Sequence, residues 1–578
     1  MEKFCAAGPT RWPTFRRYAG LEPWGVPGDA ARGAVGDWAG QASRQVGSRC
    51  DGNQSRIAVW GRSDRGNGQT MMGFDSPSLV DTGTGRQRVA RTGNGPPSGQ
   101  LWGMPEGAKK DAGVSRAWGG FEPCVKVLIA AGAASLLILA WLGGRLWTPR
   151  LFLPPSTMGK LFWLATAGYG AVMLAAMIWR VALWWRYRPL DGLMDEALPT
   201  VSVLIPAFNE GALVRQAILS AAASRYPADK LEIIAIDDGS TDDTWLHILA
   251  ATREAKRRVR VTPLRHLSNK GKRRALHLGF AEARGDVFVT LDSDSVLERN
   301  ALRNVVTPLV REPAVGCVAG CVEVLNPQQS LMTRFLKCYF SMSFKFVRAY
   351  QNEFRGVFCT PGALSAYRAE VVRRIADEWL AQRFLGQACT TGEDRAMTNL
   401  FLREGWLTAY QGNAVVRSNM PHTFAGLTRM FLRWARSNIR ETIVLFRFLF
   451  SRFRAKHLHA FRANMLLVVP SLVLPPLLVA DNAALVAMNE GYLLHRAGVI
   501  LIFAAVSAAI YYRNERDSDW VWLLVYKFFW VACLSWILPY AAMTLRNTCW
   551  LTRGSNAHRP VPAKEDPWPG MYLPVPQA

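Results

Sequence analysis

Two long apolar runs constrain the fold of this chain more than any other feature of its sequence. They occupy residues 125–147 and 161–185, and Trp141, Trp147 and Trp185 stand within them. Each run supplies about the 20 apolar residues that a helix needs to cross a hydrocarbon core of about 30 Å, and Trp is enriched where such helices meet water. We therefore predict two transmembrane helices within 125–190. A pair of buried core helices is the alternative, which we set aside because no neighbouring segment could cover them.

The charge of the chain is distributed as in a membrane protein. Half of the 578 residues are apolar, yet the formal net charge is +25. Basic residues flank the apolar runs, as at Arg186, Arg188 and Arg452, and such flanks mark the cytoplasmic side of a bilayer. No zinc-finger spacing and no basic heptad arm is found, so we expect a lipid bilayer and no nucleic acid as partner. The ten cysteines form no C-x-x-C pair and the eight histidines do not cluster, so a His/Cys metal site is not expected.

Residues 1–124 form a region of a different kind. They are rich in Gly and Arg and carry almost no periodic apolar pattern, so they bury too little apolar surface to offset the entropy of folding. We interpret them as a disordered tail, or as sequence that is not translated because the protein starts at Met104. They lack the compact apolar core of a signal peptide, and we assign them no function.

The central region, residues 198–425, alternates short β-branched runs with helical stretches, which favours a doubly wound α/β layer. The runs 201–207, 231–237 and 286–292 are almost continuously apolar, as in strands of a parallel sheet that is covered on both faces. Ligands bind such sheets at the carboxyl ends of the strands. Four acidic residues are predicted at these ends: Asp237, Asp238, Asp292 and Asp294.

The C-terminal third becomes apolar again. We predict about three transmembrane helices within 457–545, at 461–480, 498–512 and 520–541, followed by a tail at 546–578. Two leading spans return the central region to the cytoplasmic side, whereas three trailing spans place the tail outside. The tail is basic, so the span count and the positive-inside rule disagree about its side.

Residues 426–456 connect the central region to these spans. They mix Arg with Leu, Phe and Ile at helical spacing, which is typical of an amphipathic helix that lies in the membrane interface. Packing against the soluble domain is the alternative interpretation.

Acidic residues follow two of the predicted strands in a pattern that suits a divalent metal. The motif D-D-G-S-T-D-D-T covers 237–244, and L-D-S-D covers 291–294. Hard cations such as Mg²⁺ prefer carboxylate and phosphate oxygens, and two carboxylates suffice where a substrate diphosphate supplies other ligands. Between the motifs, N-K-G-K-R-R at 269–274 opens a predicted helix and suits a phosphate group. A solvated acidic turn and a solvated basic face are the alternatives.

Six motifs in order resemble a known family. They are V-S-V-L-I-P-A-F-N-E-G, D-D-G-S-T-D-D-T, N-K-G-K-R-R-A-L, L-D-S-D, G-E-D and R-W. Together, over about 199–445, they resemble processive family-2 glycosyltransferases, which include hyaluronan synthases, chitin-oligosaccharide synthases of rhizobia, poly-N-acetylglucosamine synthases and cellulose synthases. The resemblance implies an α/β GT-A domain inserted between transmembrane helices, a UDP-sugar donor, Mg²⁺ or Mn²⁺ as cofactor, and inversion at the anomeric carbon.

The same resemblance implies roles for residues on the donor side. Asp238 would contact the uridine, with Asp237 beside it. Lys272 would contact the uracil or the diphosphate. Asp292 and Asp294 would face the metal and the nucleotide, with Asp294 as the more direct ligand.

T-T-G-E-D-R at 390–395 resembles the motif that supplies the catalytic base. Inversion requires one carboxylate to take the proton of the acceptor hydroxyl as that oxygen attacks the anomeric carbon. We assign this role to Asp394 and keep its neighbour Glu393 as the rival candidate. A structural alternative is that Asp394 caps the helix that follows, as Asp often does.

Two further segments resemble the acceptor side of these enzymes. C-T-P-G-A-L-S-A-Y-R at 359–368 would present Gly362 and Tyr367 to the acceptor, although an ordinary tight turn also explains it. F-L-R-W resembles a Q-x-x-R-W element, in which Arg433 would hold the diphosphate and Trp434 would stack on the acceptor sugar. The usual Gln is Met430 here, so the polar contact of that Gln is not expected. An interfacial Arg–Trp anchor is the alternative for this pair.

These features predict a multi-pass protein of the cell's inner membrane with a cytoplasmic catalytic domain. We expect it to transfer a sugar, N-acetylglucosamine by resemblance, from a UDP-sugar to a growing β-linked polysaccharide and to export the chain. A non-processive transferase that acts on a lipid or polyprenyl phosphate is one alternative. A non-catalytic membrane scaffold is another, although the presence of Asp294 and Asp394 argues against it.

Overall fold

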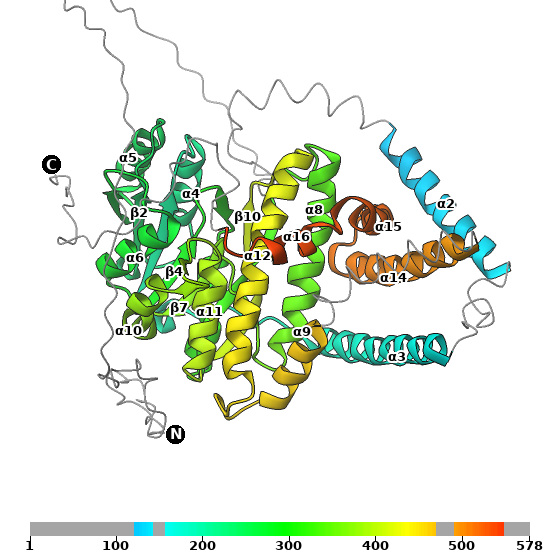
Figure 1. Cartoon of the computed structure of the whole chain (residues 1–578). Coiled ribbons are helices and arrows are strands. Elements are labelled where there is room, and N and C mark those ends of the chain that lie inside the picture. The colour runs from blue at the N-terminus through cyan, green and yellow to red at the C-terminus, as the bar shows by residue number, and fades with distance from the viewer. Residues whose placement is uncertain (1–120, 143–156, 470–490, 548–578) are drawn as a thin grey trace, which may run out of the picture. The chain divides into compact units, whose positions relative to one another are not determined.

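The computed structural model describes residues 121–142, 157–469 and 491–547 (Figure 1). Nearly all of the predicted tails at 1–124 and 546–578 lies outside these residues, as do the ends of the predicted spans 125–147 and 461–480. The domain boundaries given above therefore stay predictions.

A mixed sheet of eight strands forms the centre of the domain that follows the first two apolar helices. Its spatial order is β3-β2-β1-β4-β7-β6-β10-β5. The strands are β1 (Val201–Ala207), β2 (Leu231–Asp237), β3 (Arg260–Arg265), β4 (Val287–Leu291), β5 (Ser295–Leu297), β6 (Val315–Val324), β7 (Leu364–Arg368) and β10 (Leu407–Ser418).

The sheet is only partly parallel, which corrects the prediction of a parallel sheet. β1 pairs in parallel with β2 and β4, and β2 does so with β3. β7 lies antiparallel between β4 and β6, and the short β5 lies antiparallel to β10. A strand that is buried on both faces has the same composition whether it is parallel or antiparallel to its neighbours, so the composition of β7 could not reveal its orientation.

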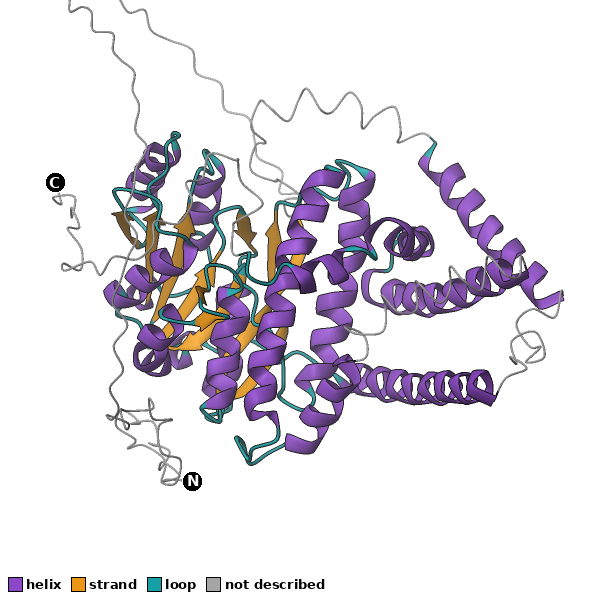
Figure 2. Cartoon of the chain, in the orientation of Figure 1, coloured by secondary structure: helices purple, strands orange, loops and turns teal. Residues whose placement is uncertain are grey.

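Helices cover both faces of the sheet, as predicted (Figure 2). Side chains alternate between the faces along each strand. Ile233 and Ala235 of β2 join one core cluster, whereas Ile234 and Ile236 join the other. The first face packs against α4 (Leu213–Ala222), α5 (Thr244–Ala255) and α7 (Ala301–Arg311), and the second against α6 (Lys272–Glu282), α10 (Ala369–Leu380) and α11 (Glu393–Arg403). Continuous apolar strands are the consequence of this two-sided burial.

Four helices are long and apolar enough to cross a membrane, among the residues that the structure describes. The spans are Glu122–Leu142, Gly168–Arg186, Arg496–Glu515 and Trp520–Met543. They fall within α2 (Glu122–Leu142), α3 (Thr157–Arg186), α14 (Gly491–Glu515) and the series α15 (Trp520–Phe529), η5 (Trp530–Leu534) and α16 (Ile537–Met543). The predicted span at 461–480 begins in the helix Leu458–Val469 and continues beyond the described residues.

The basic amphipathic segment forms one long helix, α12 (Phe424–Leu449), and it packs on one side against α11 of the domain that contains the eight-stranded sheet. Its buried residues include Met430, Phe431 and Glu441. On another side it contacts α16, where Arg436 donates hydrogen bonds to Thr544 Oγ1 at 3.0 and 3.1 Å. The helix therefore joins the domain to the apolar C-terminal segment, as the packing interpretation of 426–456 expects, and its position in a membrane interface stays a prediction.

A second helical connection runs through α8 (Leu331–Ser341), the π-helix η4 (Met342–Arg348) and α9 (Ala349–Asn352). Lys337 of α8 contacts Asp517 at 2.7 Å and Asp519 at 2.5 Å, in the turn between α14 and α15. Lys345 of η4 contacts Glu515 at 2.9 Å. This turn therefore lies on the same side of the apolar helices as the domain that contains the eight-stranded sheet.

Candidate active site

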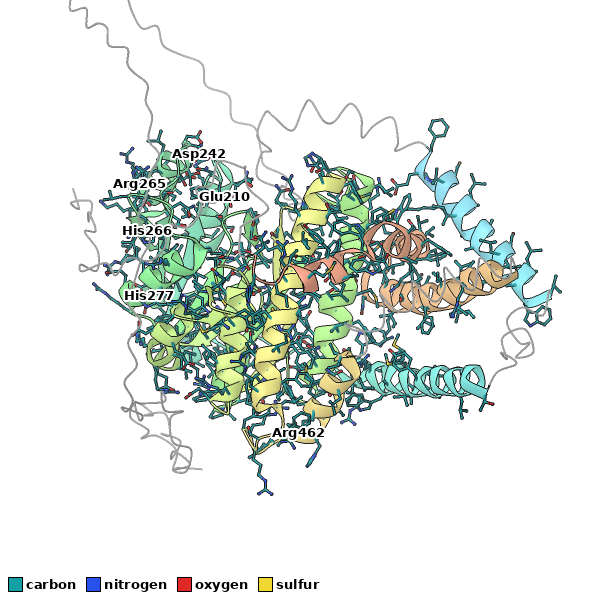
Figure 3. The ribbon with its side chains drawn as sticks, viewed as in Figure 1. Glu210, Asp242, Arg265, His266, His277 and Arg462 are labelled. Atoms are coloured by element: carbon teal, nitrogen blue, oxygen red, sulfur yellow. The ribbon has the colours of Figure 1, made fainter. Side chains whose placement is uncertain are left out.

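The loops that follow β1, β2 and β4 meet at one edge of the sheet, because these strands are parallel neighbours. Ala207 and Asp237 are partners in register at this edge. Glu210 and Gly211 donate their backbone N–H groups to Thr244 Oγ1, and Ser293 donates to Glu210 Oε1 at 2.8 Å. The three loops are thus cross-linked by hydrogen bonds. Figure 3 labels Glu210, Arg265 and His266 in this part of the domain.

The side chains of Asp237 and Asp238 link the end of β2 to the neighbouring segments at this edge. Both are buried. Asp237 forms an ion pair with Arg265 at 3.0 Å and accepts a hydrogen bond from Ser240 N–H. Asp238 contacts His266 Nδ1 at 2.7 Å and accepts hydrogen bonds from the N–H groups of Lys270 and Gly271. Asp238 therefore ties the end of β2 to the loop that opens α6, in addition to the uridine contact predicted for it.

Lys272 connects the donor motifs to the motif of the predicted base. It is the first residue of α6. Its ammonium group lies 2.5 Å from Asp292 Oδ1 and 3.0 Å from Glu393 Oε1. Burial opposes protonation of the amine, but the Asp292 and Glu393 carboxylates outweigh burial and raise the pKa of Lys272. One fixed positive charge therefore stands between two segments that are far apart in the sequence.

Gly362 packs directly against the head group of Lys272. A Cβ atom at position 362 would lie 2.8 Å from Lys272 Nζ and 3.4 Å from Asp292 Oδ1. A side chain at this position would therefore require the lysine head group to shift. The structure thus places Gly362 against the donor-side pair, whereas the sequence predicted it for the acceptor.

Asp394 and Glu393 share the first turn of α11 but have different electrostatic environments. Burial favours the neutral form of Glu393, yet the charges of Lys272 and Arg433 outweigh it and lower the pKa of this carboxyl. Burial and the neighbouring Glu393 charge raise the pKa of Asp394. A carboxylate of raised pKa is the better proton acceptor of the two.

Asp394 is not the N-cap of the helix. The N-cap is Gly392, which has a left-handed backbone with φ of 72°, and no side chain caps it. Asp394 accepts a hydrogen bond from Arg395 N–H at 2.7 Å, and the Cys359 thiol lies 3.5 Å from Asp394 Oδ2. Asp394 therefore does not occupy the N-cap position, but its carboxylate satisfies one N–H group of the first turn and benefits from the helix dipole.

Arg433 and Trp434 are neighbours on α12. The positive charge of Arg433 is one cause of the lowered pKa of Glu393. The Trp434 ring stacks on Tyr339 with centroids 6.3 Å apart, and Phe340 and Phe431 pack edge-on against it. Trp434 is half-buried. Met430, at the position of the usual Gln, is buried in the apolar core.

Tyr367 has other surroundings than the sequence predicts, whereas Asp294 lies where it was predicted. Tyr367 is buried within the second core cluster, and its hydroxyl is hydrogen-bonded to Thr360 Oγ1 at 3.0 Å. It therefore supports the turn that carries Gly362 rather than facing a ligand. Asp294 lies at the strand end, where Ser418 Oγ donates to its Oδ1 at 3.3 Å.

Asp292 and Asp294 are the residues that fit a divalent metal. They present hard carboxylate oxygens at the carboxyl edge of the sheet, which Mg²⁺ and Mn²⁺ accept. Within the described part of the chain, no group of three or more His, Cys, Asp or Glu side chains could hold a metal ion by itself. The remaining ligands would have to come from phosphate oxygens of a substrate and from water.

The sequence analysis assigned no role to Cys359 or to Arg348, which link the segment before Gly362 to Asp394 and to η4. Cys359 contacts the carboxylate itself, and Arg348 donates to the carbonyl oxygen of Cys359 at 3.4 Å. The guanidinium of Arg348 also stacks over Phe344 at 3.8 Å. Arg348 ends the π-helix η4, and π-turns often occur at functional sites, but nothing in the sequence reveals such a turn.

The chain is similar in sequence and structure to several known proteins. Residues 199–437 match the family model described as "Glycosyltransferase like family 2". An N-acetylglucosaminyltransferase of Azorhizobium caulinodans is 28% identical over 400 residues, which cover 68% of this chain and 98% of that protein. An N-acetylglucosaminyltransferase of Rhizobium leguminosarum bv. viciae is also 28% identical, over 69% of this chain and 94% of the relative. A mannosyltransferase of Pyrobaculum calidifontis, solved with GDP-Man and Mn²⁺, superimposes with a TM-score of 0.44 at 21% identity, covering 64% of this chain and 98% of that one.

Proposed function

We propose that this protein is a membrane polysaccharide synthase, because residues 199–437 match a model of glycosyltransferase family 2 and form an α/β domain around a mixed sheet. It transfers N-acetylglucosamine from UDP-N-acetylglucosamine to a growing β-linked chain, with inversion, and exports the product. The observation that carries the proposal is the contact of Lys272 with both Asp292 and Glu393. This contact places the donor motifs next to the carboxylate pair that would activate the acceptor.

The donor lies, in this proposal, at the carboxyl edge of β1, β2 and β4. Lys272 and Arg433 contribute the positive charge that the departing diphosphate requires, and such preorganised charge is commonly the largest contribution to catalysis. Asp292 and Asp294 would hold Mg²⁺ or Mn²⁺, which would neutralise part of the diphosphate charge when bound. Asp238, which braces the loop before Lys272, keeps this region in place beside the uridine.

Asp394 acts as the general base. The oxygen of the acceptor hydroxyl attacks the anomeric carbon, and its proton passes to the Asp394 carboxylate. The bond from that carbon to the diphosphate breaks, and its electron pair leaves with UDP. Attack on the side opposite to UDP inverts the configuration, so an α-linked donor gives a β-linked product. The raised pKa of Asp394 supports this assignment over Glu393, whose carboxylate is engaged by Lys272.

Trp434 would bind the acceptor by stacking on a sugar ring. Its neighbours Tyr339 and Phe340 belong to α8, which packs on the apolar C-terminal helices through Phe335, Tyr526 and Phe529. The acceptor end of the site therefore adjoins the candidate membrane helices. This arrangement supports processive synthesis in the inner membrane from a cytoplasmic catalytic domain.

A donor screen tests the proposal. Purified protein in lipid vesicles with Mn²⁺ or Mg²⁺ is supplied with UDP-N-acetylglucosamine, UDP-glucose, or UDP-N-acetylglucosamine together with UDP-glucuronate. Release of UDP and the size of the product are measured. We expect polymer from UDP-N-acetylglucosamine alone. A single-sugar lipid product would point to a lipid-directed transferase, and no turnover with any donor would point to a scaffold.

A further inference from the structure

A buried carboxylate lies outside the residues assigned above, at the junction of the helices that carry the site. Glu441 of α12 has no exposed side-chain surface. Its carboxylate contacts Arg440 Nε at 3.0 Å and accepts hydrogen bonds from Asn399 Nδ2 at 3.0 Å and Gln382 Nε2 at 3.1 Å. Its backbone carbonyl accepts a further bond from Asn399. The charge is therefore fully compensated by neighbours from α11, from α12 and from the segment after α10.

The partners of Glu441 extend the connection to the segment before the base. Arg440, also buried, donates to the carbonyl oxygen of Thr391. At Gly392 the two segments pack so closely that an added Cβ would lie 2.7 Å from Ser437 of α12. The residue after the base, Arg395, donates to Asn438 Oδ1 and Thr442 Oγ1 on α12, both at 2.9 Å. The segment 391–395 is thus held to α12 on both sides of Asp394.

The same network reaches the helix of Lys272. Gln382, which donates to Glu441, accepts a hydrogen bond from Arg273 at 2.9 Å. Arg273 is the neighbour of Lys272 in α6, and it also donates to the carbonyl oxygen of Trp379. Trp379 in turn donates from Nε1 to the carbonyl oxygen of Glu393 at 2.9 Å. Three helices that carry donor, base and acceptor residues therefore converge on one buried carboxylate.

Burying this carboxylate is expensive in free energy, because a charge loses its hydration and recovers it only through well-placed partners. Apolar side chains of similar volume would stabilise such a junction at least as well. Directional hydrogen bonds, unlike apolar contacts, specify the register of the three helices. Pre-organisation of reacting groups within about 1 Å is worth large factors in rate. A transfer between two bound substrates requires the helices that carry the reacting groups to keep a fixed register with one another.

We infer that Glu441 is a positioning residue for glycosyl transfer. It holds the base segment 391–395 in register with Arg433 and Trp434 of α12 and, through Gln382, with Lys272 of α6. The inference rests on the proposed function for the reaction itself, but the junction is a feature of the fold. Glu441 has no exposed side-chain surface and its polar partners are protein groups, so its loss should alter coupling between donor and acceptor rather than donor affinity.

The experiment compares Glu441→Gln with Glu378→Gln. Glu378 is an exposed residue of α10 that pairs with Arg403 at 2.5 Å, so its variant is a matched control for the loss of a carboxylate from an ion pair. Gln at position 441 keeps the shape but turns an amide donor toward the donors of Asn399 and Gln382. Initial rates of sugar transfer and of donor hydrolysis are measured with UDP-N-acetylglucosamine, and hydrogen exchange is followed over 388–398.

We expect Glu441→Gln to lower the ratio of transfer to hydrolysis at least tenfold, with a donor KM within about twofold of wild type. Exchange over 388–398 should become at least fivefold faster, whereas Glu378→Gln should match wild type in all three measurements. An unchanged transfer-to-hydrolysis ratio in Glu441→Gln, with or without a lower Tm, would overturn the inference. If wild type itself transfers no sugar, the proposed function fails, and unchanged exchange in Glu441→Gln would then separately overturn the positioning role.

Discussion

Replacing Gly362 by Ala should disable the donor lysine while leaving the fold intact. An added Cβ would lie 2.8 Å from Lys272 Nζ, whereas ordinary contacts begin at 3.4 Å, so the ammonium group must retreat by about 0.6 Å (3.4 minus 2.8). Nζ is held between Asp292 Oδ1 at 2.5 Å and Glu393 Oε1 at 3.0 Å. A retreat of that size lengthens at least one of these contacts. The backbone is not strained, because Gly362 does not have positive φ.

The expected magnitude follows from the interaction that is lost. A hydrogen bond between charged groups contributes about 1.5–3 kcal/mol, and 1.36 kcal/mol corresponds to a tenfold change in rate, so kcat/KM should fall by about 10- to 150-fold. The displaced atom is the end of a flexible side chain. We therefore expect Tm to change by less than about 4 °C, the shift that accompanies about 1 kcal/mol in a domain of this size.

The assay measures UDP release and Tm for Gly362→Ala, Lys272→Met, the double variant and Gly132→Ala. Gly132 lies in α2, and no heavy atom is within 4 Å of a Cβ added there, so this variant serves as the control. If Gly362 acts through Lys272, adding Gly362→Ala to Lys272→Met should cause little further loss, because effects that share one partner are not additive. Wild-type kinetics in Gly362→Ala, or fully additive losses in the double variant, would refute this reasoning.

Three further predictions concern the base, the acceptor and the C-terminal side. Burial and the charge of Glu393 raise the pKa of Asp394. Because the base must be ionised, the acid limb of the pH–rate profile should lie above the usual Asp pKa of about 3.9. Glu393→Gln removes a like charge and should shift that limb to lower pH, and an upward shift would contradict the assignment of the base. Trp434→Ala should shorten the polymer and spare donor hydrolysis, as size analysis of the product would show, and unchanged length would count against stacking. A reporter fused after residue 578 should lie on the same side of the membrane as the catalytic domain, because Thr544 accepts a hydrogen bond from Arg436 of α12. A reporter on the opposite side of the membrane would mean that α15 and α16 cross it as one span.

Several parts of the fold could be predicted because a single segment carries the information. The strands β1, β2 and β4 are continuous apolar runs, and the predicted limits of β1 and β2 match the observed ones. The leading apolar helices follow from length and composition alone. The orientation of β7 could not be predicted, because antiparallel and parallel strands with both faces buried have the same composition.

In the site, too, the sequence identified individual residues but not the contacts between them. The motifs identified Lys272, Asp292, Glu393 and Asp394, but their meeting depends on the register of β4 and on where α6 and α11 begin. For Glu441, the sequence suggested the wrong environment. In the segment R-S-N-I-R-E-T its charge suggests a solvated face, and only packing against Asn399 reveals that it is buried. Tyr367 similarly looks like a surface aromatic at the end of a turn, yet its ring belongs to the core.

Substitution of Asp394 by Asn tests the central claim most directly. The variant keeps the shape of the side chain and removes its capacity to accept the acceptor's proton. General base catalysis contributes about 10²- to 10⁴-fold to rate, so single-turnover transfer from UDP-N-acetylglucosamine should fall by at least about 100-fold, while UDP binding, measured by calorimetry, stays within about threefold of wild type. Transfer at the wild-type rate in Asp394→Asn would contradict the account, because the proton of the acceptor would then have another destination.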